Sequence, residues 1–99
     1  MEQSLFCVMI AGQAKLGMED YIREHLTKLM HRSRLEEGCI MYHLHESRDT
    51  PGEFMVYMLW DSEALFEAHN VMPEMQEFKK QLAPAWFVVQ SPKTYWQLL

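Results

Sequence analysis

Basic residues are scarce in this sequence. It has 9 Lys and Arg against 14 Asp and Glu, which gives a net charge of −5, and it has no strongly basic cluster. Binding to nucleic acid or to an acidic membrane surface needs a concentrated positive face. We therefore expect no nucleic acid and no membrane among the partners of this protein.

Cysteine and long apolar runs are scarce too. The two cysteines, Cys7 and Cys39, lie in apolar strand-like segments, which indicates buried, reduced side chains rather than a disulfide. No apolar run approaches the length that spans a membrane, and no basic leader precedes the short N-terminal one. The expected location is the cytoplasm.

Common catalytic and metal-binding motifs are absent as well. The sequence has no glycine-rich phosphate loop, no G-x-S-x-G and no C-x-x-C, which argues against a nucleotide site, a covalent serine hydrolase and a structural zinc. His43 and His45 form an H-x-H pair on one face of a predicted strand, but no third ligand at a matching spacing is evident. We expect no metal site.

The composition is that of one globular domain over residues 1–99, 48% hydrophobic and 23% charged. Apolar periodicity predicts a strand over 5–11, a helix over 18–37, strands over 39–47 and 54–60, a short helix from Ser62, a helix over 74–82, and one or two strands in the tail segments "WFVVQ" and "TYWQLL". This order is a split βαβ arrangement, an α+β fold whose antiparallel sheet carries its helices on one face.

The third predicted strand is apolar on both faces. Its alternating sets are Phe54, Val56, Met58 and Trp60 on one side, and Met55, Tyr57 and Leu59 on the other. An antiparallel sheet with one face in water should alternate apolar and polar residues, so the second face needs a cover. The chain has no residues left to provide it, which predicts a homodimer packed through its sheets.

A Trp and a His flank the corner between this strand and the short helix. The indole of Trp60 can stack on a planar ligand. The residues on the inward face of the helix are expected to be Leu65, Ala68, His69 and Met72. A neutral imidazole there could accept a proton or donate a hydrogen bond. Trp60 and His69 are either core residues with satisfied hydrogen bonds or residues that line a pocket. Asn70 is either a hydrogen-bond donor in that pocket or the residue that ends the helix.

Methionine is abundant, with nine residues in the chain. Methionine side chains adapt to irregular spaces, so they either fill the core or line an apolar ligand cavity. Both interpretations stay open for Met9, Met41, Met55 and Met58.

The segments "AKLGMEDY", "SRLEEGCIMYHLHESRDTPGEFMVYMLW" and "SEALFEAHN", with Pro73 after them, resemble the antibiotic biosynthesis monooxygenase domain. That family contains small dimeric proteins, among them cofactor-free quinol monooxygenases. The resemblance runs from about Phe6 to Leu98. It implies a ferredoxin-like protomer, a dimeric α+β barrel, and a pocket between the sheet and the helices.

The resemblance also implies a chemistry without a cofactor. In the oxygenases of this family, an electron-rich aromatic such as a quinol, a phenol or an anthrone reacts with O₂ without metal or flavin. The protein need only bind the substrate, exclude water, take or share a proton and steady the anion. The implied site residues are His69 as base or hydrogen-bond donor, Tyr42 as a catalytic hydroxyl, Trp60 as a stacking wall, and Tyr57, Met58 and Asn70 as further substrate contacts.

Two positions depart from the family pattern. Met58 stands where many members have a Glu, and Glu74 stands where many have a His. Either a proton acceptor is lost or Glu74 replaces it. The sequence thus predicts a cofactor-independent monooxygenase for a small electron-rich aromatic. A non-catalytic ligand-binding or stress-response dimer, and an isomerase of a small carbonyl compound, are the alternatives.

Overall fold

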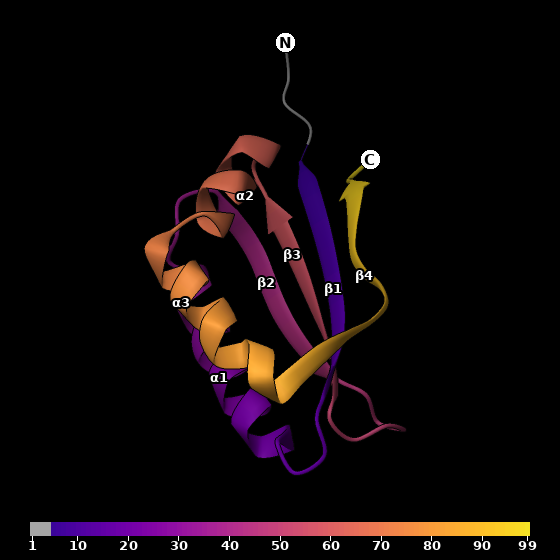
Figure 1. Cartoon of the computed structure of the whole chain (residues 1–99). Helices are drawn as coiled ribbons and strands as arrows, with labels where there is room; N and C mark the ends of the chain where they lie inside the picture. The colour runs from indigo at the N-terminus through magenta and orange to yellow at the C-terminus, as the bar shows by residue number, and fades with distance from the viewer. Residues whose placement is uncertain (1–4) are drawn as a thin grey trace.

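The structure, a computed structural model, describes residues 5–99, apart from the side chains of residues 87–93. Its elements are β1 (Phe6–Ala14), α1 (Glu19–Ser33), β2 (Cys39–Glu46), β3 (Glu53–Trp60), α2 (Glu63–Asn70), α3 (Pro73–Leu82), a short 3-10 helix (Ala83–Ala85) and β4 (Trp86–Gln97). The strands form one antiparallel sheet in the order β2-β3-β1-β4, and the helices lie together on one side of it (Figure 1). The predicted α+β, ferredoxin-like split βαβ fold is confirmed.

The end of α1 differs from the expectation. The helix ends at Ser33 and not near residue 37, because the chain turns over residues 34–38 before it enters β2. Gly38 has a φ of 85°, and a Cβ atom at this position would lie 2.5 Å from Cδ1 of Leu65 in α2. Glycine thus lets the turn lie directly against α2. This placement brings Glu36 close to that helix.

The structure decides between one and two tail strands, and it changes the inward face expected for α2. The tail forms the single strand β4, whose register against β1 shifts between Ile10 and Gly12. On α2 the buried residues are Phe66 and His69, whereas Ala68 is exposed. His69 points inward as predicted, but the buried residue that lies on the same side of α2 is Phe66 and not Ala68. Ser62 accepts a hydrogen bond from the Leu65 backbone N–H at 3.3 Å and so caps the start of α2.

The core lies between the helices and the sheet face that they cover. Its larger cluster is formed by Val8, Leu29, Tyr42, Val56, Met58, Trp60, Phe66 and Met75. On α1 the buried residues Ile22, Leu26, Leu29 and Ser33 recur at three- and four-residue steps, so one face of the helix packs on the sheet. The exposed His31 and the half-buried His25 agree with this orientation.

The other face of the sheet, called here the open face, carries no helix in the described part of the chain (Figure 1). The strand register aligns Met41, Leu59, Cys7 and Trp96 in one row across it. Met41 and Trp96 are 43% and 57% exposed. Leu59 and Cys7, between them, are buried, so the exposed apolar side chains of this row lie at its two ends.

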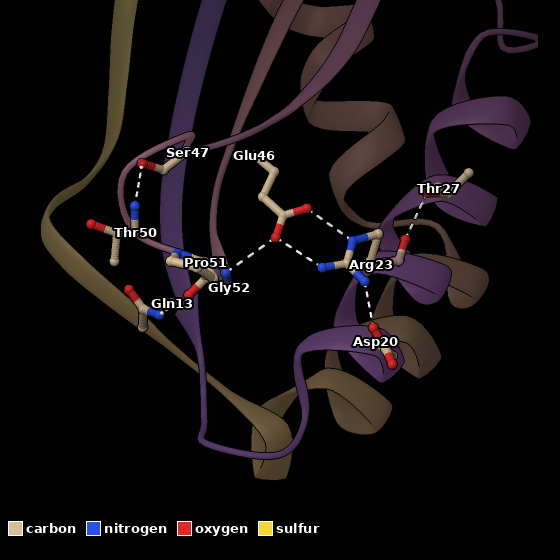
Figure 2. A network of polar contacts seen from close by, with 9 residues as sticks. All are labelled: Gln13, Asp20, Arg23, Thr27, Glu46, Ser47, Thr50, Pro51 and Gly52. Atoms are coloured by element: carbon tan, nitrogen blue, oxygen red, sulfur yellow. Dashed lines mark hydrogen bonds and ion pairs between the residues drawn. The ribbon is translucent and has the colours of Figure 1, made fainter.

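A polar network joins α1 to the β2–β3 hairpin (Figure 2). Nε and Nη2 of Arg23 donate to the two carboxylate oxygens of Glu46 at 2.9 and 2.8 Å, and the Gly52 N–H donates to the same carboxylate at 3.2 Å. Asp20 accepts a further hydrogen bond from Arg23. Because the paired guanidinium favours the ionised form, the pKa of Glu46 lies below its ordinary value of 4.5.

Replacing Glu46 with glutamine is expected to lower the melting temperature by about 3 °C at pH 7. Since the pKa of Glu46 is lower in the folded than in the unfolded state, its stabilisation is complete above the unfolded value and is lost as the pH falls through the folded one. The difference between wild type and Glu46→Gln should therefore shrink at pH 3. Thermal denaturation followed by circular dichroism at both pH values measures it. Glu24→Gln, which breaks only an exposed pair with Lys28, is the control.

Candidate functional site

A cavity of about 200 Å³ lies between the sheet and the helices. Its walls are mostly apolar and include Leu29, Val56, Met58, Phe66, Met75 and Phe78. The indole of Trp86 forms another part of the wall and lies on Gly12, where a Cβ atom would come within 2.2 Å of the ring. An engineered cavity of about 150 Å³ holds a benzene molecule. The size therefore fits a compound of one or two rings.

Four polar side chains line this apolar cavity: Tyr42, His69, Asn70 and Lys79. They come from β2, the end of α2 and α3. Tyr42, His69 and Asn70, with Met58, are residues that the sequence predicts for the site, and the structure brings them to one cavity. Small-molecule sites commonly combine apolar walls with a few polar groups in this way.

His69 is held by a carboxylate. Its side chain is 2% exposed, and Nδ1 lies 2.8 and 3.0 Å from the two carboxylate oxygens of Glu36. A carboxylate only accepts hydrogen bonds, so in the neutral imidazole Nδ1 carries the proton and Nε2 has the free lone pair. No hydrogen bond to Nε2 is found among the described residues. This nitrogen is thus available to a ligand.

Glu36 and Lys79 are polar residues of the candidate site that sequence reasoning missed. Glu36 lies in the turn between α1 and β2, where its N–H donates to the Ser33 carbonyl and its own carbonyl accepts from Cys39. It lines an outer groove beside α2, and His69 lines both this groove and the cavity. The imidazole therefore separates the carboxylate from the cavity. The available sequence signal was the position of Glu36, two residues before Gly38 in the turn that leads into β2.

Tyr42 carries a protonated hydroxyl at neutral pH. Its side chain is buried, and burial raises the pKa of the phenol well above its ordinary value of 10, against the smaller opposite effect of the Ser33 hydroxyl. A neutral phenol donates a hydrogen bond and cannot act as a base. The Tyr42 hydroxyl can therefore donate a hydrogen bond to a ligand in this cavity.

Trp60 packs against the imidazole of His69. Its ring centroid is 4.8 Å from that of His69, and the indole is fully buried. It is not among the residues that line the cavity. Its indole N–H has no hydrogen-bond partner among the described residues. The tryptophan therefore restricts the orientation of the His69 ring, rather than forming a wall of this cavity.

Two further residues lie away from the cavity. Tyr57 points to the open face, where its hydroxyl is 3.5 Å from the Cys7 sulfur. Glu74 is on the outside of α3 and pairs with Arg32 at 2.9 Å. Glu74 therefore does not replace the carboxylate that many family members have at the position of Met58. The carboxylate in contact with a residue of the cavity wall is that of Glu36, which lies 2.8 Å from His69 Nδ1.

Within the described residues, no group of three or more His, Cys, Asp or Glu side chains is placed to hold a metal ion. Nδ1 of His43 lies 3.4 Å from Nη2 of Arg34, and Nδ1 of His45 lies 3.3 Å from the Met55 carbonyl oxygen. No helix in the described part of the chain is long and apolar enough to cross a membrane.

The fold is that of a known class of small α+β proteins. A sequence model described as antibiotic biosynthesis monooxygenase matches residues 5–81. This chain belongs to the antibiotic biosynthesis monooxygenase family. No curated protein sequence matches it.

Solved structures share the fold over nearly the whole chain. A conserved protein of unknown function from Bacteroides thetaiotaomicron, described as a possible oxidoreductase, has a TM-score of 0.87 and 18% identity, covering 97% of this chain and 99% of that one. A proposed antibiotic biosynthesis monooxygenase from Deinococcus radiodurans has a TM-score of 0.85 and 18% identity, and the match covers 96% of this chain and 92% of that one. The protein SO0527 from Shewanella oneidensis has a TM-score of 0.78 and 24% identity, and the match covers 100% of this chain and 96% of that one. At these identities the likeness shows the fold.

Proposed function

We propose that this protein is a cofactor-independent monooxygenase that oxidises a small phenol or quinol with O₂ in the cavity beside His69. The observation that carries the proposal is the buried His69–Glu36 pair at the wall of an apolar cavity. A carboxylate behind an imidazole fixes the tautomer and stabilises the imidazolium that proton uptake produces. The pair is thus built to take a proton from a ligand hydroxyl.

The reaction needs only the substrate and O₂, as the example of 1,4-naphthoquinol shows. Nε2 of His69 takes the hydroxyl proton, and the resulting anion passes one electron to O₂. The superoxide and the organic radical then combine, which forms a C–O bond at a ring carbon. The imidazolium returns its proton to the peroxide. The O–O bond then breaks, the ring carbon loses its hydrogen, and water leaves. Naphthoquinol and O₂ thus give 2-hydroxy-1,4-naphthoquinone and H₂O.

The remaining site residues favour this sequence of steps. The Tyr42 hydroxyl can donate to the substrate anion, and the apolar walls strengthen this interaction because they exclude water. Met58 and Phe66 provide contact surface for a flat ring. The cavity volume favours substrates of one or two rings over a three-ring anthrone.

The active form is proposed to be a cytoplasmic homodimer of this single domain. The support for the dimer is the open face, where half-buried Met9 and Tyr57 lie beside the exposed Met41 and Trp96. A second copy packed on this face would bury these side chains and give the dimeric barrel of the family.

Oxygen uptake by the metal-stripped protein tests the proposal. We expect uptake above the uncatalysed rate with 1,4-naphthoquinol and benzoquinol, and little or none with anthrone because of its size. Uptake that does not exceed the protein-free rate with any of these compounds would count against the monooxygenase and leave the second candidate.

The second candidate is a dimer that binds an apolar ligand without chemistry. The observation in its favour is Met58, which lines the cavity where many family members have a carboxylate. It predicts saturable binding of 1-naphthol, seen as quenching of tryptophan fluorescence, without oxygen uptake from any quinol.

A further inference from the structure

Lys79 of α3 is a cation without a carboxylate partner at the edge of the cavity. Its ammonium donates a hydrogen bond to Oδ1 of Asn70 at 3.1 Å. No Asp or Glu oxygen among the described residues lies within ion-pair distance of it. In a chain with 14 acidic residues, no carboxylate of the described part pairs with this lysine, which lies beside an apolar space.

Lys79 marks the mouth of the cavity. It is the exposed residue of the described lining, and the other lining residues are buried or half-buried. Asn70 lies beside it, half-buried, and follows His69 directly in α2. Because the Asn70 amide is neutral, it orients the ammonium without cancelling its charge.

We propose that the substrate carries a carboxylate or a similar anionic group, and that Lys79 pairs with this group at the cavity mouth. The inference deepens the proposed function and rests on it, since it takes the cavity beside His69 as the substrate site. The aromatic ring lies between the apolar walls, and the anionic group stays at the mouth, where it keeps part of its hydration. Such an arrangement selects a hydroxyaromatic acid over the corresponding neutral phenol.

A purely structural role for Lys79 makes a different prediction. A lysine near the end of α2 also interacts favourably with the negative end of the helix dipole. Loss of that interaction would lower stability and would weaken the binding of charged and neutral ligands alike. A change in preference between the two ligands is therefore the readout that separates the roles.

The test compares 1-hydroxy-2-naphthoate with 1-naphthol, which differ by one carboxylate. Binding is measured by quenching of tryptophan fluorescence at pH 7 and low ionic strength. We expect wild type to bind the carboxylate about fivefold more tightly, as fits a partly exposed ion pair. Lys79→Met should abolish the preference and Lys79→Arg should keep it. Lys80→Met, which changes the adjacent exposed lysine, should leave both affinities unchanged. Added salt should reduce the preference in wild type.

The outcomes separate the two proposals. Equal affinity of wild type for both ligands, or a preference that persists in Lys79→Met, overturns the role of Lys79 but leaves the cavity as the binding site. Absence of binding of both ligands overturns the Lys79 assignment and the proposed site together.

Discussion

Replacing His69 with glutamine is expected to lower oxygen uptake with naphthoquinol by at least about 100-fold, the usual contribution of a positioned base. Glutamine can keep a hydrogen bond to Glu36 and fills similar space, but it cannot accept the substrate proton. The initial rate is measured with an oxygen electrode, and circular dichroism checks that the fold is retained. His31→Gln, on the exposed side of α1, is the matched control and should keep wild-type activity.

Glu36→Gln refines this prediction. The amide oxygen can still accept the Nδ1 proton, so the ring stays oriented, but it no longer stabilises the imidazolium. We expect kcat to fall about tenfold with little change in KM, as for other partners of a functional histidine. Full activity of Glu36→Gln would remove the carboxylate from the mechanism, and full activity of His69→Gln would remove the base itself.

Replacing Met9 with lysine is expected to abolish the proposed dimer. Met9 lies half-buried on the central strand β1, in the open face. In a dimer packed through this face, the substitution would bury an unpaired ammonium in each copy. An unpaired buried charge costs about 3–5 kcal/mol.

Sedimentation equilibrium over a range of concentrations measures this effect. Wild type should have twice the mass of the chain and Met9→Lys the mass of a single chain. Gln76→Lys, which adds the same charge on the exposed side of α3, should stay dimeric. A monomeric wild type at micromolar concentration would contradict the inference from the open face.

The fold followed from patterns that local physics imposes on the sequence. Three- and four-residue spacing identified α1, and apolar runs with turn residues between them identified β2 and β3. Their order left few topologies for so short a chain. The end of α1 was misjudged because Arg, Leu and Glu, which make up residues 34–37, all have high helix propensity. Its actual end depends on how the turn packs against Leu65.

The site was predictable where it depends on neighbours along the chain. Trp60 and His69 flank one corner, and their rings are in contact. Glu36 lies 33 positions before His69, so only the tertiary fold reveals their contact. Strand alternation already placed Tyr57 on the face opposite Met58. Lys79 had a usable signal, because it shares a helical face with Met75, four residues before it.

The most direct test of the central claim follows the oxygen atoms. Naphthoquinol is incubated with the protein under ¹⁸O₂, and the product is analysed by mass spectrometry alongside an assay for hydrogen peroxide. A monooxygenase that acts through His69 should form 2-hydroxy-1,4-naphthoquinone with one ¹⁸O atom, and His69→Gln should not form it above the protein-free rate. Unlabelled 1,4-naphthoquinone with an equivalent of hydrogen peroxide, or equal labelling by His69→Gln, would contradict the claim.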